Sequence, residues 1–196
     1  NFLYSIMERK NVILLEGNHE RWLWYWSHGG TGKSHEFEKV TRRQLEMGGL
    51  DTKIARMLYR KLGQCAYYKY HEKIVLVTHA GLSFIPNNMT ALATEQMIRG
   101  VGRYSDYVEV AQTFERMAEP DTYQIFGHRN TQNLPIGLSK HCFNLEGGVE
   151  FGGDLRVVTL DTDGFHPVYI KNTVFKEDGE DEPVAYTEQE LDVMEM

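Results

Sequence analysis

A short apolar run near the start of the chain constrains its fold most. Residues 12–15 are β-branched or aliphatic, and Gly17 and then Asn18, His19 and Glu20 follow closely. Such a run predicts a buried strand, and a glycine just beyond it lets the chain turn tightly. Since open α/β sheets bind ligands at the carboxyl ends of their strands, we expect a strand end that presents an amide, an imidazole and a carboxylate.

Two later runs repeat this arrangement. Residues 74–77 give an apolar strand pattern that ends near His79, and residues 123–126 give another that ends near His128. Neutral imidazole binds Mn, Fe, Zn or Ni, and an amide oxygen suits the harder of these ions. One histidine at a strand end is usually structural, but Asn18, His79 and His128 share one context. Together they predict a metal site, provided that a carboxylate completes it.

The remaining periodicity indicates helices alternating with strands and then a β-meander. Apolar residues at helical spacing predict helices, and short apolar runs between glycine-rich turns predict strands. We expect helices at residues 2–9, 35–47, 51–62, 90–99 and 107–118, and further strands at 67–70, 142–145, 155–160 and 167–171. This order predicts an α/β (α+β) fold of two packed sheets flanked by helices. Residues of about 30–65 would form a cap-like helical insertion.

The composition fits a globular domain with a sizeable core. The chain has 196 residues, of which 41% are hydrophobic, and a formal net charge of −7. That charge argues against a large non-specific nucleic-acid surface, although it leaves room for a small basic groove. No apolar run approaches a membrane span, and Cys65 and Cys142 indicate no disulfide framework. We therefore expect no membrane partner, a cytoplasmic protein and two buried thiols.

Both ends of the sequence indicate a longer polypeptide. The chain opens directly on a helical pattern without an initiator methionine, and a charged stretch at residues 176–186 leads into a helix signal at 187–196. We therefore expect one domain over residues 1–175, an acidic linker and the start of a further helix.

Four stretches of the sequence resemble motifs of calcineurin-like metallophosphoesterases. Residues 15–20 (Leu-Glu-Gly-Asn-His-Glu), 78–82 (Thr-His-Ala-Gly-Leu) and 126–128 (Phe-Gly-His) are similar to the third, fourth and fifth motifs of that family. Residues 144–155 resemble a late signature of one branch. That branch holds phage and bacterial Ser/Thr-type phosphatases, diadenosine tetraphosphate hydrolases and the phosphatase domain of bacterial polynucleotide kinase-phosphatases. The resemblance spans about residues 1–171.

The resemblance implies a two-sheet fold and a metal-dependent phosphatase with two divalent transition-metal ions, manganese first, with iron, zinc or nickel as alternatives. Asn18, His79 and His128 would bind one ion, and a hydroxide activated by both metals would attack phosphorus. His19 would act as general acid, and Glu20 would hold the loop behind the ligands. The first two motifs of the family, Asp-x-His and Gly-Asp-x-x-Asp-Arg-Gly, would precede residue 1. We therefore expect this stretch alone to lack a complete two-metal site and to be inactive.

Three features bear on the substrate. Protein-phosphatase relatives often carry arginine at the position of Glu16, so a phosphoprotein substrate is less favoured. Arg129 is a candidate phosphate ligand, with a loop-bracing role as the alternative. The aromatic cluster at residues 22–26 is a candidate surface for stacking bases, with a core role as the alternative. The aromatic cluster, the resemblance of residues 144–155 to the late signature and the two ends that indicate a longer polypeptide favour a polynucleotide-end phosphatase of an RNA-repair protein. A Ser/Thr protein phosphatase and a dinucleoside polyphosphate hydrolase remain alternatives.

Two interpretations belong to other classes. The chain is also compatible with a non-catalytic binding module that keeps the fold. In addition, residues 27–34 nearly spell a phosphate-binding P-loop, with 23–26 as the strand before it, although a plain glycine-rich loop explains the same residues. The histidines outside the motifs lie in polar or loop contexts, and we expect them to be exposed: His28, His35, His71, His141 and His166.

Overall fold

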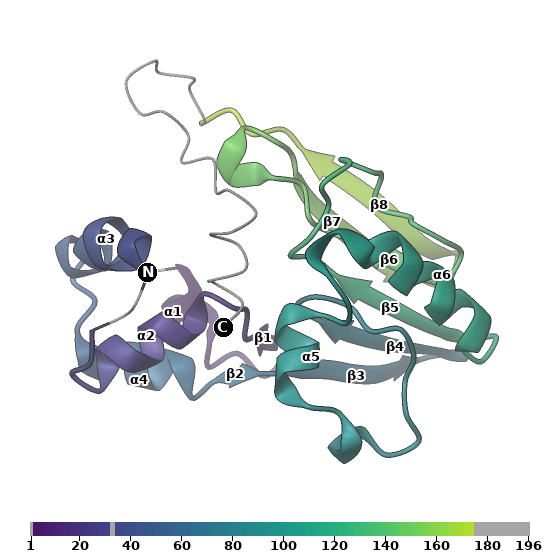
Figure 1. Ribbon diagram of the computed structural model, residues 1–196, viewed down its shortest axis with the longest axis horizontal. Coiled ribbons are helices and arrows are strands. Elements are labelled where there is room, and N and C mark those ends of the chain that lie inside the picture. The colour runs from purple at the N-terminus through teal and green to yellow at the C-terminus, as the bar shows by residue number, and fades with distance from the viewer. Residues whose placement is uncertain (1, 32–33, 175–196) are drawn as a thin grey trace. The chain divides into compact units, whose positions relative to one another are not determined.

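The computed structural model describes residues 2–31 and 34–174, and the chain divides into two compact units. The first unit runs from Asn1 to Ala66, and the second begins at Tyr67 (Figure 1). The expected acidic linker at 176–186 and the helix at 187–196 lie outside the described residues. Within them, no helix is long and apolar enough to cross a membrane.

The first unit is mainly helical. It contains α1 (Phe2–Ile6), α2 (Glu20–Ser27), a π-helical segment (Phe37–Thr41) that continues into α3 (Arg42–Met47), α4 (Thr52–Tyr59), and the short parallel strands β1 (Leu14–Leu15) and β2 (Leu62–Gly63). Asp51 caps α4, because its Oδ1 accepts a hydrogen bond from the N–H of Ile54 at 2.7 Å. Leu23 and Trp26 of α2 pack against Ala55 and Leu58 of α4 in the core.

The helices expected at 35–47 and 51–62 are confirmed as elements, and the strand expected at 12–15 is reduced to Leu14–Leu15. The helix expected at 2–9 ends at Ile6. The strand at 23–26 that a P-loop would require is wrong, because these residues lie within α2. Leu23 and Trp26 are three positions apart, so a helix buries both on one face.

A four-stranded sheet runs from the end of the first unit into the second. Its strand order is β3 (Cys65–Tyr70), β4 (Lys73–Thr78), β5 (Thr122–Phe126) and β6 (Cys142–Asn144). β4 pairs with β5, and β5 with β6, in parallel. The strand expected at 67–70 is confirmed as part of β3, which lies at the edge of this sheet. Because β4 and β5 are parallel neighbours, their carboxyl ends meet at the same edge of the sheet.

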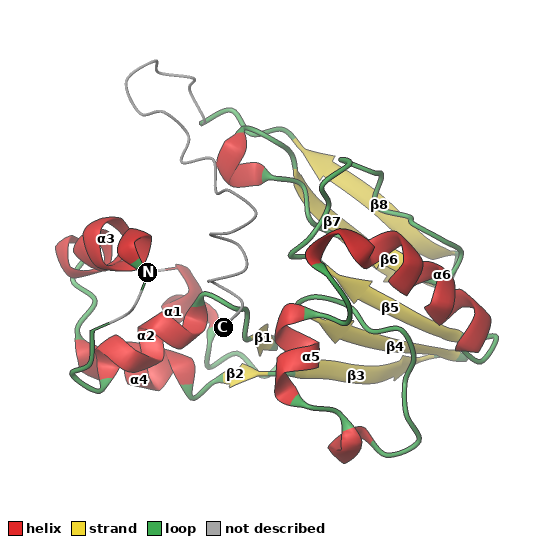
Figure 2. Ribbon diagram, in the orientation of Figure 1, coloured by secondary structure: helices red, strands yellow, loops and turns green. Residues whose placement is uncertain are grey.

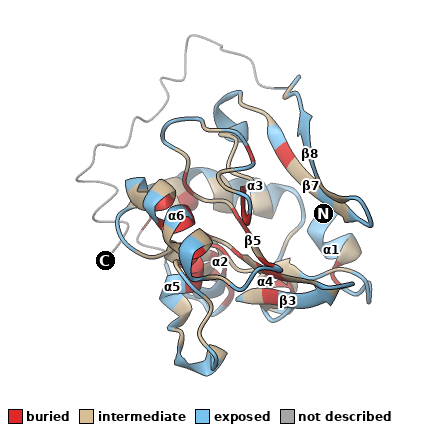
Figure 3. Ribbon diagram, turned by 90° about the vertical axis from the view of Figure 1, so that its right-hand side faces the viewer, coloured by how far each residue is buried: buried red, intermediate tan, exposed pale blue. Residues whose placement is uncertain are grey.

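The second unit is layered. On one face of the sheet, α6 (Tyr107–Met117) buries Tyr107 and Phe114 against Phe126 and Cys142. The antiparallel pair β7 (Leu155–Asp161) and β8 (Gly164–Ile170) contributes Val158, Leu160 and Phe165 to a separate cluster with Val75, Ile125 and Phe143. A short helix, α5 (Thr94–Arg99), precedes α6 (Figure 2). Buried residues are concentrated on α6 and β5 (Figure 3). The described residues therefore form a mixed α+β protein, as expected, with several sheets. The two-sheet arrangement implied by the family resemblance stays a prediction.

Three expectations about burial are wrong. The run at 12–15, expected as a buried strand, is only partly buried, and Ile13 is 64% exposed. His141 is only 6% exposed, because its Nδ1 lies 2.9 Å from Oε1 of Glu115 and its Nε2 lies 2.8 Å from the carbonyl of Pro120. Cys65 is partly exposed, whereas Cys142 is buried as expected, and both thiols are free.

Candidate metal-binding site

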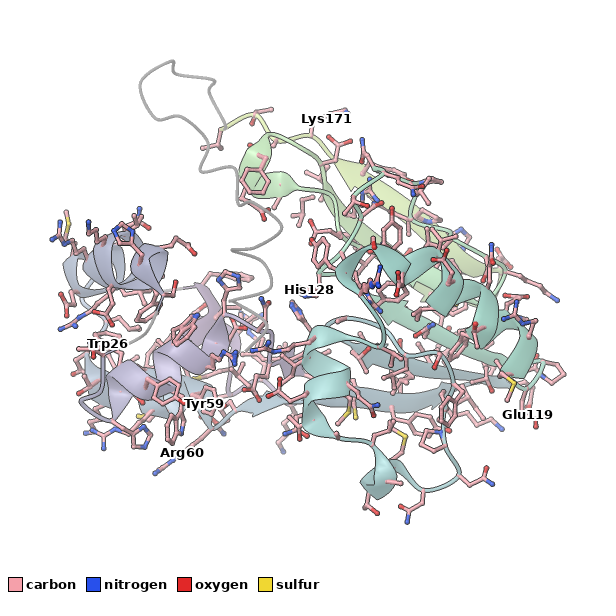
Figure 4. All side chains as sticks on the ribbon, in the orientation of Figure 1. Trp26, Tyr59, Arg60, Glu119, His128 and Lys171 are labelled. Atoms are coloured by element: carbon pink, nitrogen blue, oxygen red, sulfur yellow. The ribbon has the colours of Figure 1, made fainter. Side chains whose placement is uncertain are left out.

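Two histidines meet at the carboxyl edge of the sheet in the second unit. His79 directly follows β4, and His128 lies two residues beyond β5 (Figure 4). Their ring centroids are 4.7 Å apart and the ring planes are inclined by 41°. Both residues are partly buried. The sequence predicted that these two strand ends would bring their histidines together, and the pairing of β4 with β5 accounts for it.

The backbone around the histidine pair is held by hydrogen bonds. The N–H of Gly127 donates to the carbonyl of His79 at 2.8 Å, and the hydroxyl of Tyr104 donates to the carbonyl of His128 at 2.7 Å. His128 has a φ of 72°, a left-handed conformation that costs energy for a side chain of this kind. The surrounding contacts hold the residue in this conformation.

Tyr104 also contacts the imidazole of His128 directly. The two rings meet edge to face, with centroids 5.3 Å apart. Burial, together with the charges of Glu146 and Glu150, raises the pKa of Tyr104 to about 12. The phenol is therefore neutral at physiological pH and keeps its proton for the hydrogen bond to His128. Sequence reasoning missed this residue, because nothing in its local pattern distinguishes it.

Arg129 is fully buried and braces the two loops. Its Nε donates to the carbonyl of Ala80 at 3.1 Å, and its Nη1 donates to the carbonyls of Val101 and Arg103 at 3.0 Å each. A Cβ added to Gly100 would lie 2.6 Å from the guanidinium carbon. These contacts support the loop-bracing role of Arg129, and its role as a phosphate ligand stays a prediction. In the sequence, the two glycines Gly100 and Gly102 could have indicated the loop-bracing role, because they flank Val101, whose carbonyl accepts a hydrogen bond from Arg129.

The late stretch that resembles the family signature supports the same loop. The side-chain amide of Asn144, at the end of β6, donates to the carbonyl of Arg129 at 2.8 Å. Its Oδ1 accepts from the N–H of Glu146 at 2.9 Å, and the amide of Asn130 donates to the carbonyl of Glu146 at 3.0 Å. Residues at the end of β6 thus stabilise the loop that carries His128.

The loop that carries Asn18 and His19 belongs to the first unit. Oε2 of Glu20 accepts a hydrogen bond from the N–H of Gly17 at 2.7 Å, so Glu20 holds this loop; its predicted place behind a metal ligand stays a prediction. Asn18 is partly buried. The side chain of His19 is 56% exposed, and its Nδ1 lies 3.8 Å from Oε2 of Glu36.

Glu16, which precedes this loop, has a specific partner. Its Oε1 accepts a hydrogen bond from the hydroxyl of Tyr59 at 2.6 Å. Burial and the neighbouring Glu16 carboxylate raise the pKa of Tyr59, so the phenol remains a donor. Glu16 therefore ties the end of β1 to α4, a structural role that the sequence did not indicate.

The histidine pair fits half of a transition-metal site, since paired imidazoles are typical ligands for such ions. Across residues 2–31 and 34–174, no group of three or more His, Cys, Asp or Glu side chains lies close enough to hold an ion. His79 and His128 are the predicted ligands that the second unit brings together. Asn18 belongs to the first unit, and its role as a ligand stays a prediction. Comparison with models of known families gives no match, and comparison with curated proteins gives none either.

Proposed function

We propose that this chain is part of a metal-dependent phosphoesterase, an enzyme that hydrolyses phosphate esters. The observation that supports the proposal most is the approach of His79 and His128 at the ends of two parallel strands, with ring centroids 4.7 Å apart. Hydrogen bonds hold the backbone at both histidines, and His128 has a left-handed backbone. Strained and well-supported residues of this kind are typical of functional sites.

In this proposal the residues have separate tasks. His79 and His128 bind a divalent ion through their imidazoles, and Asn18 offers an amide oxygen. When bound, divalent ions supply Lewis acidity and make a nucleophile available from water at neutral pH. The exposed imidazole of His19 donates a proton to the leaving oxygen. Manganese is the first choice of ion, because the set mixes imidazoles with a hard oxygen.

The narrower form of the proposal is a phosphatase that acts on polynucleotide ends. Glu16 argues against a phosphoprotein substrate. Its carboxylate accepts a hydrogen bond from Tyr59, so this position offers no positive charge to bind a phosphate group. A Ser/Thr protein phosphatase and a dinucleoside polyphosphate hydrolase are the alternative substrate classes.

The test compares His128→Ala with His71→Ala in the longest form of the protein that its gene encodes. Both histidines have positive φ, 72° and 51°, so backbone effects of the substitution are matched. We expect manganese-dependent release of p-nitrophenol from p-nitrophenyl phosphate to fall by more than about a hundred-fold in His128→Ala alone, because an ion contributes several kcal/mol to such a reaction. Equal activity in the two variants would contradict the proposal. Metal binding without hydrolysis would favour the non-catalytic binding module.

A further inference from the structure

One face of α2 presents aromatic and cationic side chains to solvent. Arg21, Trp24, Tyr25 and His28 follow the spacing i, i+3, i+4 and i+7, so they form one line along the helix, which we call the aromatic stripe. The opposite face buries Leu23, Trp26 and Ser27 in the core of the first unit. The stripe is therefore not needed for the packing of α2, and the alternative of a purely core role for the aromatic cluster fails for Trp24 and Tyr25.

The rings of the stripe are ordered by contacts with one another. Trp24 and Tyr25 are 40% and 45% exposed, and their rings meet edge to face with centroids 5.1 Å apart. The ring of His28 lies 4.6 Å from that of Trp24, and its Nδ1 is 2.8 Å from the carbonyl of Trp24. Exposed aromatic faces that are already held in place lose little conformational entropy when a ligand stacks on them.

The charge of the chain is distributed unevenly, and the stripe lies in its positive part. Residues 1–66 contain eleven Lys and Arg against seven Asp and Glu, a formal charge of +4. Residues 67–174 contain nine against twelve, and residues 175–196 contain one against nine. On α4, which packs against α2, Lys53 is exposed, and the exposed Arg60 follows its last residue. The first unit is therefore positively charged, although the whole chain has a net charge of −7.

We infer that the aromatic stripe binds single-stranded polynucleotide, with bases stacked on Trp24 and Tyr25 and the backbone attracted by the surrounding cations. Every base has a face that can stack, so such a surface is tolerant of sequence. Tryptophan, tyrosine and arginine are also common in protein interfaces, but the positive charge of this unit complements a polyanion. The stripe begins directly after the loop that carries His19, and α2 is about 12 Å long. A strand bound along α2 can therefore extend to that loop.

This inference rests on the proposed function in one respect: the end of the bound polynucleotide would be the substrate of the phosphatase. The test is kept separate from catalysis by measuring only binding, with EDTA present. A fluorescein-labelled oligouridylate of about twelve nucleotides, which spans a typical single-strand site, is titrated with the full chain and followed by fluorescence anisotropy. Oligouridylate forms little structure of its own, so the signal reports contacts to the protein.

We expect Trp24→Leu to weaken binding about ten-fold and the double variant with Tyr25→Leu about a hundred-fold, because stacking is lost one ring at a time. Trp24→Phe should keep most of the affinity, since it keeps a ring. Tyr4→Leu is the matched control, because Tyr4 is similarly exposed (42%) on α1 of the same unit, and its affinity should not change. Arg21→Gln should reduce the dependence of log affinity on log salt concentration by about one.

Two outcomes would overturn the inference. One is an affinity for oligouridylate that Trp24→Leu leaves unchanged or that Tyr4→Leu lowers equally. The other is a change of sedimentation behaviour in Trp24→Leu with no change in oligonucleotide binding, which would assign the stripe to a protein interface instead. If the wild-type chain binds oligouridylate through the stripe but hydrolyses no phosphate ester, this inference stands and the proposed function fails.

Discussion

The loop after β5, which carries His128, and the loop after β1, which carries Asn18 and His19, are built differently. The carbonyls of His79, His128 and Arg129 all accept hydrogen bonds, and a buried guanidinium adds three more bonds to the same frame. In the first loop, the carboxylate of Glu20 accepts from the N–H of Gly17 and the carbonyl of His19 accepts from the N–H of Trp22, while the side chain of His19 is 56% exposed. A metal ligand must be fixed to bind well, which suits the role proposed for His128, whereas an exposed imidazole can reach a leaving group, which suits the role proposed for His19. Asn18, the third proposed ligand, shares the loop of His19.

The largest effect should follow from Arg129→Met. This change removes the buried donors while keeping the length of the side chain, and it leaves the carbonyls of Ala80, Val101 and Arg103 without their partner. We expect the free energy of unfolding of the second unit to fall by about 3–5 kcal/mol, measured by urea denaturation. If stability were unchanged and KM for a phosphate ester rose, Arg129 would contact substrate and the loop-bracing role would be wrong.

A change at Gly100 tests the same frame from its other side. Gly100 has φ 85° and ψ −175°, a region that is almost restricted to glycine, and a new Cβ would meet the Arg129 guanidinium at 2.6 Å. We expect Gly100→Ala to destabilise the fold by about 3 kcal/mol. Gly49→Ala is the control, because Gly49 has φ 80° with nothing within 4 Å of the added atom. It should cost only about 1 kcal/mol, and equal losses would mean that contact with Arg129 is unimportant.

A smaller effect is expected in the first loop. Glu20→Ala removes the acceptor of the Gly17 N–H and should cost about 1 kcal/mol, whereas Glu20→Gln keeps an acceptor oxygen and should cost less. Amide hydrogen exchange at Gly17 is the readout: we expect it to accelerate in Glu20→Ala and to be largely restored in Glu20→Gln. Exchange that is equally slow in both variants would show that the loop does not depend on this contact.

The smallest effect concerns pH and the start of β6. Burial alone would raise the pKa of Glu115, but hydrogen bonds from Ser139 and His141 outweigh it and lower the pKa below 4.5. A carboxyl whose pKa is lowered by folding contributes stability above its unfolded pKa and loses that contribution as the pH falls through its folded value. Glu115→Gln should therefore be less stable than wild type by up to about 1 kcal/mol at neutral pH, and the difference should shrink below pH 4.5. If the stability difference between Glu115→Gln and wild type stayed the same below pH 4.5, it would not arise from the charge of Glu115.

The sequence predicted local structure well and long-range support poorly. The three strand ends follow from hydrophobic runs that stop at polar residues, and the proximity of His79 and His128 follows from parallel pairing. The partners of Arg129 and His141 did not follow, because they come from segments more than twenty residues away. The contact of Glu16 with Tyr59 was hidden for the same reason. The local sequence pattern predicts a helix or strand and where it ends, but the hydrogen-bond partners of a side chain depend on how distant segments pack.

The most direct test of the central claim is to observe the histidines themselves while Mn²⁺ is added. In a heteronuclear spectrum of the imidazole groups, paramagnetic broadening at substoichiometric Mn²⁺ identifies the rings closest to the ion. We expect the signals of His79 and His128 to broaden first and together, while those of the exposed His35 and His71 remain sharp. Early broadening of His35 or His71, with His79 and His128 unaffected, would contradict it.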